Sequence, residues 1–268
     1  MTSHAPGPRP VVEARDLHKT YATPDGKNIA LAGVSFDVLP GEIAALVGPS
    51  GAGKTTVLRI VAGLLEPSAG SATVNGERVT GPPQGVAMVF QDYSRSLLPW
   101  LTVLGNVMLP MRAAGVSRTQ ARDRALHALG SVGLPDKGRL HPRALSGGMQ
   151  QRVAIARALA FQPSVLLMDE PFASVDAQTR MDLEDLVLPL RDEYEVTILF
   201  VTHDIDEAVY LSDRVISLTP PPSVVGEVLH VDLPSPRHQV HTKSDPAFAT
   251  TREHVLSLVR TRPQGADL

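Results

Sequence analysis

The chain has 268 residues, of which 43% are hydrophobic and 20% are charged, and its formal net charge is −3. This length allows one large or two small domains, and the composition favours a folded, soluble globular protein. The lack of a basic excess argues against a nucleic-acid partner. No apolar run approaches the roughly 20 residues of a membrane-spanning helix. The start has no apolar stretch typical of a secretory signal, and the absence of cysteine excludes disulfides, so we expect a cytoplasmic protein.

The first predicted elements are strands, which follow a Pro-rich, polar lead that we expect to be disordered over residues 1–10. Residues 11–19 and 31–38 alternate apolar and polar side chains, which predicts an antiparallel pair of half-buried strands. Residues 43–47 form a short, fully apolar run that indicates a buried strand. Residues 55–65 then carry apolar side chains at helical spacing, so the order here is strand, loop, helix.

The middle of the chain changes from strand to helix character. Residues 66–90 have strand and turn patterns, and Asn75-Gly76 is a strong hairpin signal. Residues 92–160 are mainly helical in pattern and look like an insertion, because strand patterns resume after them. The simplest architecture is therefore a doubly wound α/β domain with a helical subdomain.

Two further strands are predicted in the last third of the chain, at residues 165–168 and 197–201. A helix over residues 177–191 separates them. Pro189 falls inside this helix and should end or kink it, because proline lacks the N–H that a helix interior needs.

A phosphate-binding loop is predicted where the apolar strand at residues 43–47 ends. The sequence GPSGAGKT matches G-x-x-x-x-G-K-[ST], in which glycines let backbone N–H groups curl around phosphate oxygens at the start of a helix. A chance Gly-rich turn is disfavoured, because a buried strand precedes the loop and a helix follows it. Lys54 is expected to pair with phosphates and the Thr55 hydroxyl to bind Mg²⁺. The candidate ATP-binding residues of the loop are Gly48, Pro49, Ser50, Gly51, Ala52, Gly53, Lys54, Thr55 and Thr56.

Two acids, Asp169 and Glu170, follow the apolar strand at residues 165–168. The carboxyl ends of strands are where α/β sheets bind ligands. We expect Asp169 to hold Mg²⁺ and Glu170 to act as the general base that polarises the attacking water. In isolation the pair is more typical of a solvated strand end, but beside a phosphate loop the functional interpretation is favoured.

The segment LSGGMQQR, residues 145–152, is a second Gly-rich segment at a predicted helix start. Ser146 stands at the N-cap position, and apolar residues from Met149 onward continue the helix. Ser146, Gly147 and Gly148 therefore offer a hydroxyl and bare N–H groups at a positively polarised helix end. Alone, the segment is more typical of a capped helix. Since one nucleotide needs only one phosphate loop, a second site indicates the ATP of another copy of the chain.

Together these motifs resemble the ATP-binding subunits of ABC transporters, over about residues 11–220. The resemblance implies a P-loop NTPase (RecA-like) core with an antiparallel β subdomain and an inserted helical subdomain. We expect the ATPase domain at residues 11–225, its helical subdomain at about residues 92–160, and a short C-terminal extension with a strand and a helix at residues 226–268.

Four further positions match the family pattern. Tyr21 falls where the family stacks an aromatic ring on adenine. Gln91 resembles the glutamine that contacts Mg²⁺ and the water and links the site to the membrane partner. Asp176 matches the D-loop aspartate that communicates across the dimer, and His203 matches the switch histidine at the γ-phosphate. Singly, each has a structural alternative, such as a strand aromatic, a polar cap or a strand-end histidine. Their order beside the other motifs favours the functional interpretation.

The sequence departs from the family pattern at two motifs. In the segment at residues 145–152, Met149 replaces the glutamine that is usual in the family. Phosphate binding would then depend on the Ser146 hydroxyl and the backbone N–H groups. Ser174 and Val175 replace the commoner D-loop residues, which puts their contacts across a dimer in doubt.

The transporter class is indicated by residues 96–107 and by the C-terminal segments 233–237 and 245–259, which are similar to importer ATPases for nitrate, sulfonate and taurine. The resemblance implies a homodimer, or paired ATPase subunits, on two membrane permease subunits at the cytoplasmic face of the inner membrane. An extracytoplasmic solute-binding protein would select the cargo. Trp100 has either a packing role or a role near the permease, and His238 with His241 is more typical of solvated surface than of a metal site.

Two rival functions remain open. A soluble ABC-type ATPase of DNA repair or translation usually carries a long coiled-coil insertion or tandem cassettes, and neither is visible in this sequence. A P-loop kinase for a small molecule would leave residues 145–152 unexplained.

Overall fold

The computed structural model describes residues 9–24, 26–92 and 96–260. Most of the lead expected to be disordered, residues 1–8, lies outside this part. The chain forms two compact units, one of Met1–Pro83 with Leu199–Leu268 and one of Gln84–Ile198. We refer to them as unit 1 and unit 2. No helix among the described residues has both the length and the apolar character needed to cross a bilayer.

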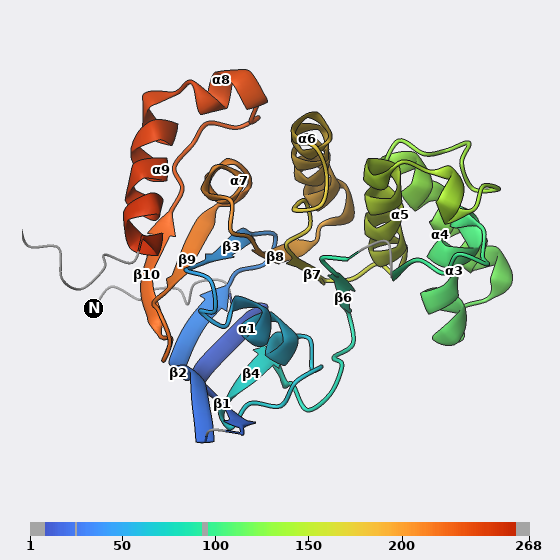
Figure 1. The fold of residues 1–268 in the computed structure, drawn as a ribbon. Helices are drawn as coiled ribbons and strands as arrows, with labels where there is room; N and C mark the ends of the chain where they lie inside the picture. Colours follow the sequence, from blue (N-terminus) through green and yellow to red (C-terminus); the bar gives the residue numbers. More distant parts are fainter. Residues whose placement is uncertain (1–8, 25, 93–95, 261–268) are drawn as a thin grey trace, which may run out of the picture. The chain divides into compact units, whose positions relative to one another are not determined.

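An antiparallel sheet forms the N-terminal part of unit 1, as predicted (Figure 1). Its strands, in the order β2-β1-β4-β5, are β2 (Gly26–Val38), β1 (Val12–Thr23), β4 (Ala69–Val74) and β5 (Glu77–Arg78). Between β4 and β5, Asn75 and Gly76 both have positive φ, 52° and 78°. That backbone is the type I′ hairpin turn for which Asn-Gly is the preferred sequence, so the hairpin prediction is confirmed.

One close backbone approach shapes this sheet. Strand β1 changes register between Arg15 and His18, and Asp16 has φ 49°. A Cβ on Gly70 would lie 2.0 Å from the Asp16 carbonyl oxygen. Only glycine therefore fits at position 70, where β4 begins beside the irregular part of β1.

The second sheet of unit 1 carries the phosphate loop. The buried strand β3 (Ile43–Val47) is parallel to β9 (Arg214–Leu218), and β9 is antiparallel to β10 (Val225–His230). A fully apolar strand such as IAALV is typical of a parallel strand covered on both faces. Strand β8 (Thr197–Val201), also buried throughout, is the segment in which the chain passes from unit 2 back to unit 1.

The helices of unit 1 are α1 (Lys54–Val61), α7 (Ile205–Leu211), α8 (Gln239–Lys243) and α9 (Pro246–Val259). Helix α1 ends earlier than the predicted range of residues 55–65. Gly63, with φ 67°, leaves the helical region, and a Cβ there would lie 2.0 Å from the Gly81 carbonyl oxygen. This approach of a distant segment ends the helix, and the apolar periodicity does not reveal it.

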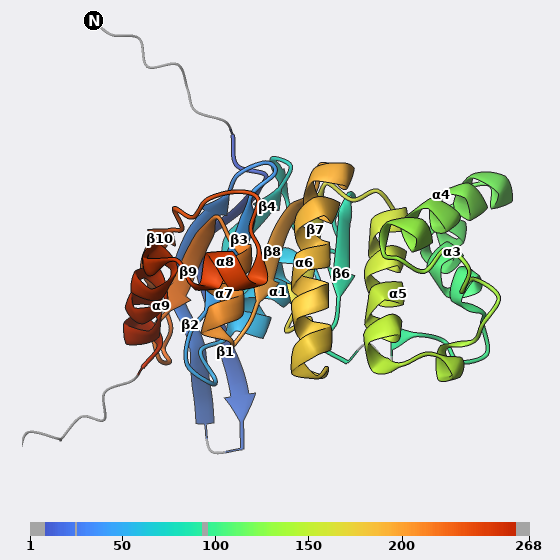
Figure 2. The ribbon, with the colours of Figure 1, turned by 90° about the horizontal axis from the view of Figure 1, so that it is seen from above.

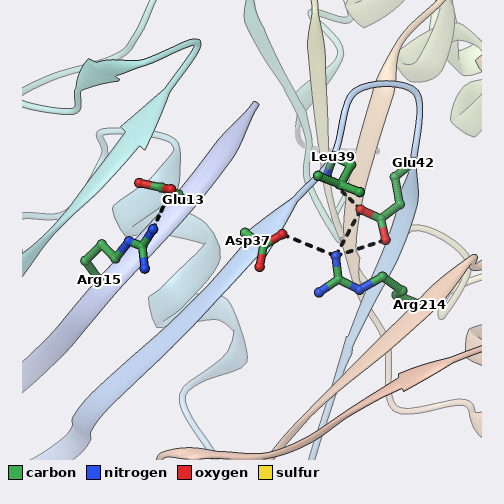
Figure 3. Close-up of polar contacts among 6 residues, drawn as sticks. All are labelled: Glu13, Arg15, Asp37, Leu39, Glu42 and Arg214. Carbon is green, nitrogen blue, oxygen red and sulfur yellow. Dashed lines mark hydrogen bonds and ion pairs between the residues drawn. The ribbon is translucent and has the colours of Figure 1, made fainter. Parts of the chain in front are cut away.

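A polar cluster joins the two sheets of unit 1 (Figure 3). Arg214 on β9 lies 3.4 Å from carboxylate oxygens of both Asp37 and Glu42. Glu42 is only 8% exposed, and its carboxylate also accepts a hydrogen bond from the Leu39 N–H at 2.7 Å. Burial raises the pKa of Glu42, while the Leu39 N–H and Arg214 act in the opposite direction. On β1 nearby, Arg15 donates to Glu13 at 2.7 Å.

Unit 2 contains the predicted helical segment and two parallel strands, β6 (Val86–Val89) and β7 (Val165–Asp169). Helices α3 (Val103–Ala113), α4 (Arg118–Ser131) and α5 (Gly147–Ala160) contact one another and form a bundle (Figure 1). A short 3-10 turn, η1 (Pro142–Ala144), precedes α5, and α6 (Ala177–Tyr194) follows β7. Serine, threonine or aspartate caps each of these α-helices, at Thr102, Ser117, Ser146 and Asp176.

Pro189 was predicted to end or kink its helix, and it does not end the helix, because α6 continues to Tyr194. Pro189 is exposed, whereas Val187 and Leu190 on either side of it are buried. Their packing holds the helix on both sides of the missing hydrogen bond, so tertiary contacts override the local preference of proline.

Candidate functional site

The phosphate loop connects β3 to α1 within unit 1. Gly48, Gly51 and Gly53 have positive φ values of 154°, 79° and 76°. A Cβ on Gly48 would lie 2.9 Å from the Leu218 carbonyl oxygen, so β9 also requires glycine there. No side chain caps the start of α1, whose N-cap is Gly53. The loop therefore presents backbone N–H groups at a helix start, which is an anion-binding arrangement.

Lys54 folds back over this loop. The side chain is buried, and its Nζ donates to the Gly48 carbonyl at 2.8 Å and to the Pro49 carbonyl at 3.1 Å. Thr55 and Thr56 follow on the first turn of α1 and are half-buried. The loop thus holds one ammonium group and two hydroxyl groups at the start of a single helix.

Tyr21, on β1, lies beside the end of the phosphate loop. Its hydroxyl is 3.1 Å from the Thr56 Oγ1, and the Nζ of Lys19 is 5.5 Å from its ring centroid. The side chain is 37% exposed. The structure therefore places an accessible aromatic ring next to the phosphate loop, as an adenine-stacking residue would require.

His203 follows the end of β8, and its neighbour Thr202 connects it to the strand before the phosphate loop. The Thr202 N–H donates to the Leu46 carbonyl at 3.4 Å, two residues before Gly48. Thr202 is buried and His203 is exposed. His203 therefore follows the C-terminal end of β8 at a point where the chain is hydrogen-bonded to β3, the strand that leads into the phosphate loop.

In unit 2, the ends of two neighbouring parallel strands bring Gln91 and Glu170 together. Gln91 follows β6 and Glu170 follows β7, and the Gln91 Nε2 donates to the Glu170 Oε2 at 2.8 Å. Asp169, the last residue of β7, is buried. Glu170 has φ 44°, an uncommon backbone conformation that is often found at functional positions.

The second Gly-rich segment forms the start of α5, as expected. Ser146 is the exposed N-cap, and its Oγ accepts from the Met149 N–H at 3.4 Å. Gly147, Gly148 and Met149 are half-buried. A Cβ on Gly148 would lie 2.3 Å from the Thr179 Cγ2, so the glycine lets the Thr179 side chain of α6 pack closely against this point of α5.

Thr179 also connects this segment to Asp176, the N-cap of α6. Asp176 accepts from the Thr179 N–H at 3.0 Å and from the Thr179 Oγ1 at 2.7 Å. The first of these hydrogen bonds, followed by the second, lowers the pKa of Asp176. Thr179 was not predicted from the sequence. Its contact with Gly148 and its hydrogen bonds to Asp176 become apparent only when α5 packs against α6.

Metal binding is chemically compatible with the candidate residues. Thr55, Gln91 and Asp169 supply hydroxyl, amide and carboxylate oxygens, which suit Mg²⁺. Among the described residues, no cluster of three or more histidine or acidic side chains is arranged to hold a metal ion. His238 and His241 form only a tilted ring pair, with centroids 5.0 Å apart.

A phosphate loop between a buried strand and a helix, with acids at a parallel strand end, defines a P-loop ATPase. The ABC transporter family profile matches residues 31–173, and the chain belongs to this family. It is 40% identical to the nitrate transport protein NasD of Klebsiella oxytoca, over 96% of this chain and all of that protein. It is also 40% identical to the nitrate import ATP-binding protein NrtD of Synechocystis, over 94% of this chain and 96% of that protein.

Solved structures agree with this assignment. A dimeric ATP-binding cassette in a post-hydrolysis state with ADP and Pi is 32% identical, with a TM-score of 0.70, over 82% of this chain and 98% of that one. The protein is therefore an ATP-hydrolysing subunit of an ABC importer. The rival assignments to DNA repair, translation or small-molecule phosphorylation are not favoured.

Proposed function

We propose that the chain drives uptake of a small solute, with nitrate as the first candidate and sulfonates or taurine as alternatives. The names of NasD and NrtD support nitrate, and the sequence resemblance includes the other two. The solute would pass through a separate membrane permease, with an extracytoplasmic binding protein selecting it. The chain itself would lie at the cytoplasmic face of the inner membrane.

The hydrogen bond between Gln91 and Glu170 is the observation that best supports the chemistry. We propose that it orients one Glu170 oxygen, so that the other accepts a proton from the water that attacks the γ-phosphate. Asp169, Thr55 and Gln91 would hold Mg²⁺, which would neutralise charge on the phosphates. His203 would contact the γ-phosphate.

Lys54 has a defined part in ATP binding under this proposal. Its ammonium now donates to two carbonyls of its own loop. Phosphate oxygens carry more negative charge than carbonyls and would attract this donor more strongly. The side chain would therefore turn from the loop to the β- and γ-phosphates, while Tyr21 would stack on adenine.

The working unit is proposed to be a homodimer in which each ATP is shared. Ser146, Gly147 and Gly148 of one protomer would contact the ATP held by the partner's phosphate loop, and Asp176 would link the two sites. The dimeric state of the related cassette with ADP and Pi supports this arrangement.

A mixed dimer tests the shared site. One protomer carries Lys54→Ala and the other carries Ser146→Arg, so that one composite site has both defects and the other has none. We expect about half of the wild-type ATP hydrolysis, because the intact site keeps its donors. If each protomer binds its own ATP alone, both sites carry one defect and hydrolysis is lost in the mixed dimer.

Uptake measurements test the solute. A strain without this chain is supplied with nitrate, taurine or an alkanesulfonate as the limiting source of nitrogen or sulfur, and uptake of each labelled solute is measured. We expect nitrate uptake to depend on the chain and on an intact Lys54. Nitrate uptake that persists in the deletion strain, with loss of taurine or sulfonate uptake, would reassign the cargo.

A further inference from the structure

The C-terminal helix α9 is held firmly against unit 1. It contacts α7 and β9, and Figures 1 and 2 both show it beside them. Its N-cap Asp245 accepts from the Ala247 N–H at 2.8 Å, and Phe248 and Val255 are buried. A capped helix with buried anchors can act as a rigid support for its neighbours.

Two cationic residues of the C-terminal segment, Arg237 and Lys243, contact Tyr210 near the C-terminal end of α7. Arg237 donates to the Tyr210 carbonyl at 2.6 Å, and the Nζ of Lys243 lies 4.9 Å from the centroid of the Tyr210 ring. The Tyr210 side chain is fully buried. Helix α7 has only seven residues, so contacts of this kind contribute more to its position than its own hydrogen bonds do.

A third cation reaches the other end of α7, close to His203. The Arg252 guanidinium donates to the Asp206 carboxylate. His203 and Arg252 line the same cavity of about 290 Å³, together with Asp204, Ile205, Asp206 and Leu256. Asp204 caps α7 by accepting from the Glu207 N–H at 3.2 Å, so the start of α7 and His203 form one short, connected segment.

We propose that Arg252 is a positioning residue for ATP hydrolysis. Its ion pair with Asp206 holds the first turn of α7 and thereby sets the position of the His203 imidazole three residues earlier. The inference rests on the proposed role of His203 at the γ-phosphate. It gives the C-terminal extension a function in the catalytic cycle in addition to its packing.

The test measures hydrolysis by the full chain carrying Arg252→Ala. We expect kcat to fall roughly five- to tenfold, less than the roughly hundredfold cost of misplacing a group by a full ångström. The KM for ATP should change less than about twofold, because Asp206 and Arg252 are not among the residues proposed to bind ATP. Asp206→Asn should lower kcat by the same factor, and the double variant of Arg252→Ala with Asp206→Asn should lower it no further. Arg252→Lys, which keeps the positive charge, should retain most of the wild-type rate.

His254→Ala is the matched control. His254 lies on the same helix, and its Nε2 is 3.0 Å from Glu227 Oε1 on β10, away from α7. Both ion pairs are partly exposed, so neither variant should lower the melting temperature by more than about 3 °C. An unchanged kcat in Arg252→Ala, or an equal loss in His254→Ala, would overturn the proposal.

A second measurement is independent of activity. With labelled histidine, the ring Cε1–H resonance of His203 should shift in Arg252→Ala and stay in place in His254→Ala. His203→Ala separates this inference from the proposed function. If His203→Ala hydrolyses ATP normally, the role of His203 is wrong and the inference fails with it. If that variant is inactive while Arg252→Ala is normal in rate and spectrum, only the inference fails.

Discussion

Two structural constraints act on Glu170. Its side chain accepts a hydrogen bond from Gln91, and its backbone lies in the left-handed region. A non-glycine residue held in such a conformation costs about 1 to 3 kcal/mol, and the surrounding structure must supply that energy. The position of the carboxylate is therefore set by both the strand end and the side-chain partner.

Substituting Glu170→Gln keeps the shape of the side chain and removes its basicity. We expect ATP binding to persist and hydrolysis to fall by at least about a hundredfold, the usual size of a general-base contribution. The variant should also accumulate as an ATP-bound dimer, which size-exclusion chromatography with ATP can measure. Glu195→Gln is the control, because Glu195 also has a positive φ, 49°, and caps the C-terminus of α6. Near-normal hydrolysis by Glu170→Gln would remove Glu170 as the base.

Functional residues that belong to a motif of fixed spacing could be predicted from the sequence. Residues whose role depends on packing between distant segments could not. The phosphate loop and the N-cap at Ser146 depend on neighbours in the sequence, so their local patterns suffice. Thr179 and Arg252 act on segments that are distant in the sequence. No local pattern distinguishes them from other polar helix residues.

At the scale of elements, the sheet of β1 and β4 depends on a glycine that the local pattern does not mark. Gly70→Ala would place a Cβ 2.0 Å from the Asp16 carbonyl, and backbone atoms cannot move aside cheaply. We expect it to destabilise the fold by about 3 kcal/mol or more beyond Gly76→Ala. Gly76 has a similar φ, 78° against 83°, but nothing lies within 4 Å of its Cβ position. Urea unfolding of the two variants makes the comparison, and equal midpoints would contradict it.

The polar cluster around Arg214 predicts a stability that depends on pH. Arg214 is 12% exposed, and Arg214→Met would leave the buried Glu42 carboxylate without its cation. We expect a loss of about 3 kcal/mol at pH 8, since removing one partner of a buried pair is costly. Asp37→Asn should cost less than about 1 kcal/mol, because Asp37 is 44% exposed.

The sign of the pH effect follows from the raised pKa of Glu42. The folded state then binds the proton more tightly than the unfolded state does, so the stability from this group falls as pH rises through the folded pKa. Without Arg214 the pKa rises further. The loss in Arg214→Met should therefore be larger at pH 8 than at pH 5, and denaturant titrations at both pH values measure it. An equal loss would mean that Glu42 is not the source.

The limits of two helices show where element prediction failed. Helices were predicted at residues 55–65 and 177–191, but the contact of Gly63 with Gly81 ends α1 early, and buried neighbours stabilise α6 beyond Pro189. The Asn75-Gly76 hairpin was predictable because two adjacent residues determine the geometry of its turn. Helix ends that depend on contacts with distant segments cannot be predicted from the local sequence pattern.

At the scale of the whole molecule, the proposed function requires a surface that contacts a membrane permease. The Trp100 side chain is 71% exposed, and exposed Phe90 and Leu109 belong to the same unit. Exposed apolar side chains that gather in one patch often mark a protein-binding surface. A cavity of about 220 Å³ in this unit is lined by Val86, Ala87, Met88, Pro110, Arg157, Ala158 and Phe161.

Trp100→Ala should therefore separate transport from hydrolysis. We expect solute uptake in cells to fall at least about tenfold, as for loss of an aromatic interface anchor. Hydrolysis by the purified chain should stay near normal. Leu126→Ala, which removes an exposed apolar side chain on α4, is the control and should leave uptake unchanged. Normal uptake by Trp100→Ala would remove this residue from the permease contact.

The discontinuity of unit 1 has a consequence for how the protein is made. Strand β3 belongs to the early part of the chain, but its parallel neighbour β9 comes from the last third. At usual elongation rates of about 5 to 20 residues per second, a ribosome needs roughly ten to thirty seconds to synthesise β9 after β3. Unit 2 is continuous, and all of it is synthesised during this interval. The nascent phosphate loop therefore waits for its supporting sheet, and the ATP site matures only near the end of translation.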